Sequence, residues 1–405
     1  MFDALSARTV FPHEAALRDA IRTWVGALTV ARITEAHRAD EARVETEVNL
    51  DVRLEIPATT SFRGAWRGLL GASSVVVAQA WLAAAAEGGP AVADARRERA
   101  VVEEEVARRL GHASVEALLG GPAHHVLAPL ARSFIAETAD LARSLRSEKL
   151  RRGEPASAVR EILDARGRGA PEGWPRTLSL RAVVETLRAP KDLGRGLRVG
   201  AGMPRIVGAA SFVRGLERFG EGYRRAAALS TNQPFSTMHP PWFVDAPRFG
   251  FAFASLAQNV QYQQKGLGLA SRVAQHQARS LCAIALLEAR AVALAYLLAP
   301  SERRSDRALF EELTTEVYGQ PLPPSLAGAF PRVDRAAERV TALLTTLPLL
   351  TALRDQFDED WFRNPRAWVF LRVRASAPCT AAPAGVAEET PDPLALARAF
   401  EEGLG

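Results

Sequence analysis

The helical spacing of apolar residues through most of the 405-residue chain is the feature that most constrains its fold. Apolar side chains recur every three or four positions, which places them on one face of a helix that can pack against a core. The ranges with this spacing are 12–38, 72–86, 93–110, 127–151, 208–228, 268–299, 305–318 and 334–355. The sequence therefore predicts a mainly α protein.

One segment has the two-residue period of a half-exposed β-strand instead. Between positions 48 and 56 apolar residues alternate with polar ones, and Pro57 follows. Shorter strands are expected at Leu197–Val199, Arg205–Val207 and Trp368–Arg374. The expected fold is thus helical with a few short β-strands.

Glycine and proline divide the chain into two expected helical lobes. The boundary falls in the Gly- and Pro-rich stretch 166–176, so the first lobe covers 1–165 and the second covers 177–375. Residues 376–405 are predicted to form an Ala/Pro-rich linker and a short C-terminal helix. A chain of this length can bury a full core in each lobe.

Charge and cysteine content argue against several classes of protein. The net charge is +5, but basic and acidic residues interleave, as at positions 96–99, and form no basic stripe of the kind that binds nucleic acid. Cys282 and Cys379 are the only cysteines, too few for a disulfide framework or a Cys-rich zinc site. We therefore expect no nucleic-acid partner.

The sequence also predicts a cytoplasmic protein without a membrane span. The first residues carry early charges and no apolar core of a signal peptide. The longest apolar stretch, residues 72–86, contains Gln79 and is shorter than the ~20 residues that cross a bilayer. We expect this stretch to be a buried helix.

Two glutamates one helical turn apart mark the most informative segment. Glu217 and Glu221 are i,i+4 neighbours on one helix face, and Arg218 lies one step round the helix. One interpretation is a solvent-exposed face on which the glutamates pair with nearby arginines, namely Arg214, Arg218, Arg224 and Arg225. Another is a carboxylate site for Mg, Ca or Mn that includes Asp245.

The same segment resembles the zinc-binding helix of the M3/M32-like helical oligopeptidases, which are metallopeptidases of the gluzincin type. The family motif often reads His-Glu-x-Gly-His-Ala, whereas residues 217–222 read Glu-Arg-Phe-Gly-Glu-Gly. Residues 309–330 and 350–371 are similar to the C-terminal helices and turns of the family, so the resemblance covers residues 195–372. It implies a two-lobed, gluzincin-like helical fold with a cleft beside the motif helix.

The residues that zinc hydrolysis requires in this family are replaced. In the family two histidines bind zinc, and the glutamate after the first histidine is the general base. Glu217 and Glu221 stand at the histidine positions. Arg218 stands at the position of the base, and a guanidinium cannot accept a proton at working pH. The resemblance therefore implies a chain that has lost peptidase activity.

Two further parts of the family's site are missing. The third zinc ligand comes from a later helix, but between Glu221 and Glu288 the only acid is Asp245, which we expect in a loop. A Tyr-rich segment helps to bind the tetrahedral intermediate in the family, whereas residues 332–344 contain no Tyr or His. No catalytic residue, metal or cofactor is therefore predicted for this chain.

A Pro-rich and aromatic segment, residues 230–249, is predicted to be a loop near the motif helix. Its aromatic side chains suit either core packing or a cleft between the lobes that binds a peptide or a small apolar ligand. The candidate cleft residues are Tyr223, His239, Trp242, Phe243 and Asp245.

These patterns favour a catalytically inactive, peptidase-like protein that binds a peptide or protein partner. Two alternatives stay open: an active hydrolase with a different metal or catalytic set, and a structural subunit of a larger assembly. The sequence leaves the oligomeric state open.

Overall fold

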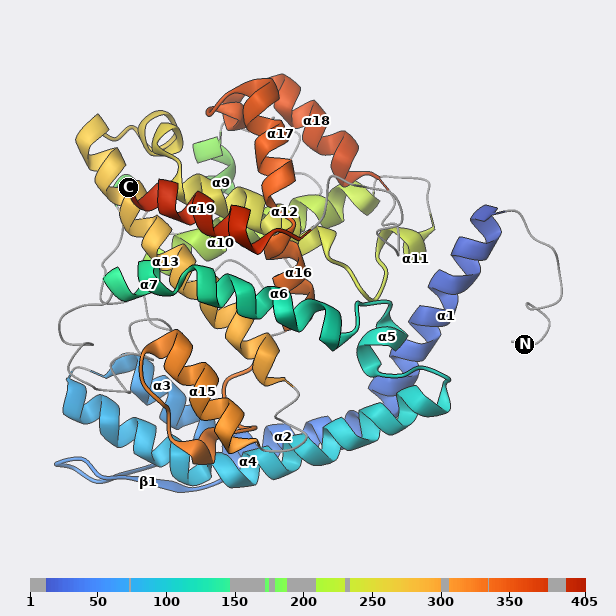
Figure 1. Cartoon of the computed structure of the whole chain (residues 1–405), viewed down its shortest axis with the longest axis vertical. Coiled ribbons are helices and arrows are strands. Elements are labelled where there is room, and N and C mark those ends of the chain that lie inside the picture. The colour runs from blue at the N-terminus through green and yellow to red at the C-terminus, as the bar shows by residue number, and fades with distance from the viewer. Residues whose placement is uncertain are drawn as a thin grey trace.

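The computed structural model describes residues 12–72, 74–145, 172–174, 179–187, 209–229, 234–299, 306–333, 335–377 and 391–405. These residues are mainly helical and include one two-stranded sheet, which confirms the predicted fold class. The long helix α13 (Ser271–Leu298) runs through the middle of the molecule, with the other helices packed around it (Figure 1).

The N-terminal residues form two helices, a β-hairpin and a third helix. They are α1 (Pro12–Ile33), α2 (Glu35–Glu47), β1 (Leu50–Val52), β2 (Ala58–Thr60) and α3 (Phe62–Gly71). The strands pair antiparallel, with Leu50 opposite Thr60. Leu50 and Val52 are buried whereas Asp51 is exposed, which is the physical cause of the alternation in the sequence. The strand predicted over 48–56 is present but shorter.

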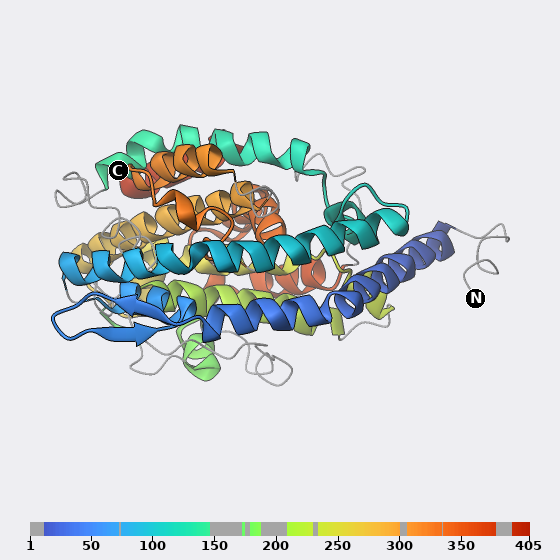
Figure 2. The ribbon, with the colours of Figure 1, turned by 90° about the horizontal axis from the view of Figure 1, so that it is seen from below.

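The helix α4 (Val75–Arg109) is one 35-residue helix in place of the two helices predicted at 72–86 and 93–110. The Gly-Gly-Pro sequence at residues 88–90, which lies between the two predicted helices, is inside α4. A Cβ atom on Gly89 would lie 3.0 Å from the carbonyl carbon of Ser325. Glycine therefore lets α4 touch the backbone of the 3-10 turn η7 (Pro324–Leu326). Figure 2 shows α4 running along the molecule beside α2 and the hairpin.

Among its described residues, the middle of the chain contains α5 (Val115–Leu119), α6 (His124–Glu137), α7 (Ala139–Ser144) and α9 (Leu180–Leu187). The break between α6 and α7 lies at Thr138, whose hydroxyl donates to the carbonyl oxygen of Phe134 at 2.7 Å. The strands predicted at 197–199 and 205–207 lie outside the described residues, as do residues 146–151 of the helix predicted to end there.

The segment around the motif is more helical than predicted. It contains α10 (Ala209–Leu229), α11 (Phe235–Met238), α12 (Asp245–Ala254), the 3-10 turn η5 (Ser255–Gln258) and the π-helical turn η6 (Tyr262–Gly266). The loop predicted over 230–249 is therefore wrong at residues 235–238 and from Asp245 onward. Pro247 lies in the first turn of α12, where its missing N–H would have no partner within the helix.

The regular elements described in the C-terminal part are all helical. It contains α15 (Arg307–Tyr318), α16 (Ala336–Leu344), α17 (Leu347–Phe357), the 3-10 turn η8 (Trp361–Arg363), α18 (Pro365–Ala375) and α19 (Pro393–Leu404). The strand predicted at 368–374 is wrong, because this segment belongs to α18. Asn364 caps the helix, and the buried residues recur every three or four positions: Ala367, Trp368, Leu371 and Ala375.

Two hydrophobic clusters form the main core of the described residues. One takes side chains from α3, α4, α6, α15, α16 and α19, and the other takes them from α10, α12, α17 and α18. α13 contributes to both, with Leu286 in the first cluster and Leu281 in the second. The first cluster joins helices from both predicted lobes. The division into lobes at 1–165 and 177–375 stays a prediction.

A largely buried ionic network joins α2 and α4 to the segment before α16. Glu41 of α2 is salt-bridged to Arg96 of α4 at 3.2 Å and also to Arg332. Arg96 is 3% exposed, pairs with Glu45 at 2.8 Å and donates to the carbonyl oxygen of Phe330 at 2.7 Å. The network therefore links the N-terminal helices to a part of the chain more than 200 positions later.

Three helical stretches of the described chain are long and apolar enough to span a membrane by length and composition: Val75–Arg109, Ser271–Leu298 and Ala336–Phe357. The most apolar windows of these stretches are 39%, 78% and 56% buried inside the protein. The prediction that the apolar stretch at residues 72–86 is too short to span a bilayer is wrong for the helix that contains most of it, because α4 extends to Arg109 and is one of these three stretches.

Candidate functional site

The motif helix α10 packs directly against α12 through two glycines. A Cβ atom on Gly220 would lie 2.7 Å from the carbonyl carbon of Phe249, and one on Gly250 would lie 3.1 Å from the carbonyl oxygen of Glu217. The two helices therefore approach backbone to backbone. The Cγ atoms of Glu217 and Glu221 would lie 3.1 and 3.0 Å from the same Gly250 Cβ, so both glutamate side chains pass over α12.

A guanidinium from a distant helix lies beside both glutamates. Arg339 of α16 donates from Nη2 to Oε1 of Glu217, and its Nη1 lies 3.6 Å from Oε1 of Glu221. Its guanidinium carbon is 5.2 Å from the centre of the Phe251 ring on α12, within cation–π range. The side chains of Glu217, Glu221 and Arg339 are 10%, 25% and 23% exposed. One cation from the chain itself is thus shared by the two motif carboxylates.

A third carboxylate belongs to the same electrostatic cluster. Glu288 of α13 pairs with Arg214 of α10 at 3.3 Å, and the charges of Glu217 and Arg339 also act on it. Burial raises the pKa of Glu288, and Arg214 opposes this rise. Neither Glu288 nor Arg339 is among the site residues predicted from the sequence. Arg339 lies within residues 332–344, whose only signal in the sequence is that they contain no Tyr or His.

Burial and neighbouring charges set the protonation of the pair. The pKa of Glu221 is raised, first by burial and then by Glu217, although Arg339 partly offsets the rise. Burial alone would lower the pKa of Arg339, but Glu217 and Glu221 raise it overall. Arg339 therefore stays charged across the physiological range, and its charge is held at the motif helix.

The interpretation of this helix face as solvent-exposed is wrong. Glu217 is 8% exposed, and its partner Arg339 lies 122 positions later in the chain. Two of the predicted partners, Arg214 and Arg224, pair with other acids. Spacing of i and i+4 identifies neighbours on one helix, but it does not show which face another helix covers.

Asp245 lies in the first turn of α12, not in a loop, and belongs to a separate ion cluster. It is salt-bridged to Arg224 at 3.2 Å and to Arg248 at 3.1 Å. Arg224 is fully buried and also donates to the carbonyl oxygen of Ala377 at 3.0 Å. In the described part of the chain, no group of three or more His, Cys, Asp or Glu is placed to hold a metal ion. The carboxylate site that would join Asp245 to the motif glutamates is therefore not formed.

Two of the predicted cleft residues, Tyr223 and Phe243, are buried in the core, each with 3% exposure. The ring centre of Tyr223 lies 5.8 Å from that of Trp368, and its hydroxyl donates to the carbonyl oxygen of Trp368 at 3.5 Å. The guanidinium of Arg224 lies 5.1 Å from the centre of the Phe243 ring. Packing inside the protein accounts for both side chains.

The other two, His239 and Trp242, lie in a part-buried region near α1 and α11. Trp24 of α1 donates from its ring nitrogen to the carbonyl oxygen of His239 at 2.9 Å. Trp242 covers Gly121, where an added Cβ would lie 2.6 Å from the indole ring. Burial lowers the pKa of His239, and Arg224 lowers it further, so the neutral form of this imidazole is favoured.

These residues do not fit the zinc site of the metallopeptidases that the motif resembles. Carboxylates replace both imidazoles, and the guanidinium of Arg339 lies where a metal cation would have to meet them. A guanidinium has no lone pair to offer as a ligand, and it repels a second cation. Arg218, at the position of the general base, cannot accept a proton.

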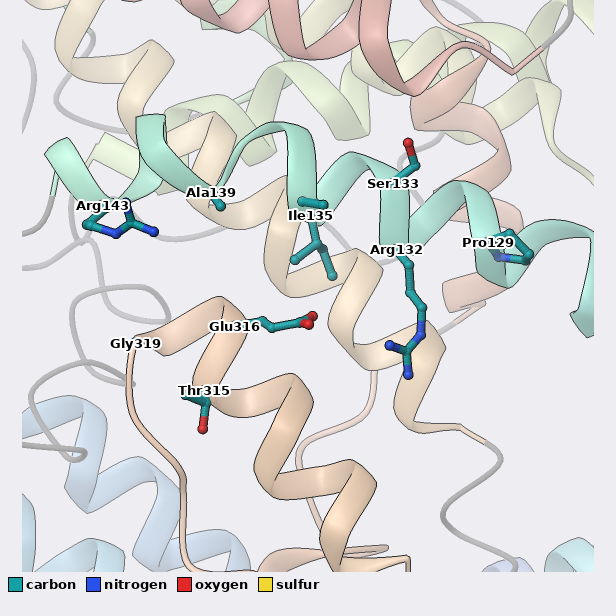
Figure 3. Close-up of a pocket in the computed structure, with 10 residues that line it drawn as sticks. Pro129, Arg132, Ser133, Ile135, Ala139, Arg143, Thr315, Glu316 and Gly319 are labelled. Atoms are coloured by element: carbon teal, nitrogen blue, oxygen red, sulfur yellow. The ribbon is translucent and has the colours of Figure 1, made fainter.

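A surface hollow of about 820 Å³ lies away from the motif helix, between α6, α7 and α15 (Figure 3). Its lining includes Pro129, Arg132, Ser133, Arg143, Thr315 and Glu316. This hollow could not be predicted from the sequence, because its walls come from segments that are far apart in the chain and carry no shared motif.

The fold and the motif helix together define a class: a mainly helical protein in which both motif glutamates lie beside Arg339. The chain is similar to the crystal structure of a "putative peptidase" from Chlamydophila abortus, with a TM-score of 0.56 and 11% sequence identity. The similarity covers 99% of this chain and 75% of that chain. At this identity the likeness concerns the fold alone. No family model and no curated protein matches the sequence.

Proposed function

We propose that this chain is a catalytically inactive, peptidase-like protein that binds a peptide or protein partner. The main support is the position of Arg339, which is paired with Glu217 and Glu221 on the motif helix. A peptidase of the resembled type needs neutral imidazoles at these positions and an open coordination position for water. A guanidinium held by two carboxylates provides neither.

The electrostatics of the motif helix favour a structural role for its charged residues. Arg339 supplies the positive charge that the glutamates would otherwise take from a bound metal ion. A bound metal ion can dissociate into solvent, whereas the charge of a side chain stays attached to the chain. The loss of either partner would leave a largely buried charge uncompensated, which favours retention of the pair.

The binding role is supported by the fold and by the surface. The resembled family binds peptides between helical lobes, and this chain keeps a peptidase-like helical fold along nearly its whole length. The hollow between α6, α7 and α15 adds an open site away from the inactive motif.

A turnover assay tests the loss of activity. A quenched fluorescent peptide library is incubated with the unmodified protein and with a triple variant that carries Glu217→His, Arg218→Glu and Glu221→His, each with and without added Zn²⁺. We expect no metal-dependent cleavage by either protein, because Arg339 still lies beside the restored positions. In addition, no group of three acids among the described residues is placed to hold a metal, and residues 332–344 contain no tyrosine. The metal content of both proteins is measured after purification without chelator.

Adding Arg339→Ala to the triple variant separates the effect of Arg339 on metal binding from the effect of the missing family residues. Metal uptake by the quadruple variant alone would identify Arg339 as the barrier to metal binding. Tightly held stoichiometric metal together with peptide turnover by the unmodified protein would refute the proposed inactivity.

A further inference from the structure

The hollow between α6, α7 and α15 is bounded by charged side chains. Figure 3 shows Arg132 on α6 and Arg143 on α7 toward its two ends, with Glu316 reaching from α15 into the space between them. Other residues of the lining, such as Ser133 and Ala136, are small. The volume of about 820 Å³ lies in the range of roughly 300–1,000 Å³ that is typical of ligand sites.

The present partners of the two arginines are weakly held because they are exposed. Arg132 pairs with Glu312 at 2.9 Å, and these side chains are 43% and 53% exposed. Arg143 pairs with Asp140 on the same helix, and these side chains are 68% and 91% exposed. Exposed pairs of this kind contribute about 0–1 kcal/mol. A ligand carboxylate that meets a guanidinium with two hydrogen bonds can therefore displace them.

Hydrogen bonds from a buried arginine hold the walls of the hollow in place. Arg290 of α13 is fully buried, donates to the hydroxyl of Thr138 at 2.6 Å and donates to the carbonyl oxygen of Glu316 at 2.9 Å. These bonds tie the junction of α6 and α7 to the end of α15. A site with walls fixed in this way is preorganised and needs little ordering when a ligand binds.

The arrangement of the charges indicates which ligand fits. At a rise of 1.5 Å per residue, the distance along α6 and α7 from Arg132 to Arg143 is about 16 Å. An extended peptide covers this distance in about five residues. Glu316 lies between the arginines and favours a positive side chain near the middle of the ligand.

We propose that this hollow binds an extended peptide segment with acidic side chains about five residues apart and a basic side chain between them. The inference rests on the proposed peptide-binding function and places the peptide away from the motif helix. The charge pattern of Arg132, Glu316 and Arg143 supplies the specificity, and the small wall residues leave room for the peptide backbone.

Fluorescence anisotropy with two labelled six-residue peptides tests this inference on the full chain. The first peptide has glutamate at both ends, lysine at the third position and alanine elsewhere, and the second has these charges reversed. We expect the first peptide to bind about tenfold or more tightly than the second at low salt. Arg132→Glu combined with Arg143→Glu should weaken binding of the first peptide about tenfold. Arg181→Glu, on an exposed part of α9, should leave its affinity unchanged.

A variant that combines Arg132→Glu, Arg143→Glu and Glu316→Lys reverses the charge pattern of the hollow and should prefer the second peptide. Circular dichroism melts show whether each variant is folded. The proposal is overturned by equal binding of both peptides, by unchanged affinities in the variants, or by no binding of the first peptide to the unmodified chain. Peptide binding that survives these variants would keep the proposed function and place its site elsewhere, whereas peptide turnover in the separate assay would refute the inactivity.

Discussion

At the scale of single residues, Arg339 decides what the motif helix can do. Glu217 and Glu221 share its guanidinium, and Glu288 adds a third carboxylate that Arg214 partly neutralises. The raised pKa of Glu221 reflects its burial and the repulsion from Glu217. Removal of Arg339 would therefore leave excess negative charge in a largely buried cluster.

Replacement of Arg339 by methionine is expected to lower the free energy of unfolding by about 3 kcal/mol at pH 7.5. The cost should depend on pH, because the pKa of Glu221 is already raised in the folded state and rises further without Arg339. A carboxyl group whose pKa is raised in the folded state stabilises that state while it is protonated. This stabilisation is fully present below the pKa of the unfolded state and is lost as the pH rises through the pKa of the folded state. Urea unfolding of the variant and the unmodified protein at pH 5 and pH 7.5 should show a larger difference at pH 7.5.

Arg354→Met is the matched control for this substitution. Arg354 pairs with Glu359 at 3.5 Å, and the side chains are 46% and 56% exposed, so its loss should cost less than about 1 kcal/mol. If Arg339→Met matched the control at both pH values, the charge of Arg339 would not be needed for stability and the inferred pairing would be wrong.

At the scale of elements, the close contact of α10 and α12 positions the motif. Gly220 in α10 and Gly250 in α12 let the two backbones meet, and both motif glutamates extend over α12 from this contact. The family motif has a glycine where Gly220 stands, so the sequence pointed to this residue. It did not identify the helix that Gly220 contacts, because Pro247 and its neighbours favoured a loop.

Gly220→Ala is expected to lower the free energy of unfolding by about 2 kcal/mol, because the new methyl group would overlap the backbone at Phe249. This cost exceeds the ~1 kcal/mol that alanine contributes over glycine within a helix. Gly26→Ala in α1 is the matched control, since its Cβ would meet only the side chain of Leu118 at 3.2 Å. Urea unfolding should show the control at least as stable as the unmodified protein. A stable Gly220→Ala protein would contradict the close approach of α10 and α12.

At the scale of the whole molecule, the ionic network around Arg96 joins the N-terminal helices α2 and α4 to residues 330–332. Burial alone would raise the pKa of Glu45, but Arg96 and Arg63 lower it overall. The stabilisation that the Glu45 carboxylate contributes is therefore present above the ordinary carboxyl pKa. It is lost as the pH falls through the lowered pKa of Glu45 in the folded state. The first hydrophobic cluster connects the same regions, since it contains buried side chains of α4, α13, α15 and α16.

Arg96→Met is expected to lower the free energy of unfolding by about 3 kcal/mol, because Glu41 and Glu45 would lose a buried partner. The unfolding transition should stay single and keep its denaturant dependence, since the hydrophobic cluster spans both predicted lobes. Arg109→Met is the control, because its pair with Glu105 is exposed and should contribute less than about 1 kcal/mol. Two separate transitions in the Arg96 variant would show that the lobes unfold independently.

The sequence by itself determined the features that depend on neighbours along the chain. Helical spacing predicted the fold class, alternation predicted the strand that contains Leu50 and Val52, and the i,i+4 spacing placed Glu217 and Glu221 on one helix face. These features follow from backbone geometry, which repeats every 3.6 residues in a helix and every two in a strand. The same local signals misled where a segment satisfied two patterns, as in α18, which has helical burial within an apolar stretch.

Only the tertiary structure decided which charges are buried, which partners they meet and where the surface is hollow. Arg339 reaches Glu217 across 122 positions, and the walls of the hollow at Arg132 and Glu316 come from separate segments. Pairing between such segments depends on how helices pack, which no local pattern encodes. The motif suggested a site that had lost its metal, and the packing of α16 against α12 and α13 brought an arginine to that site.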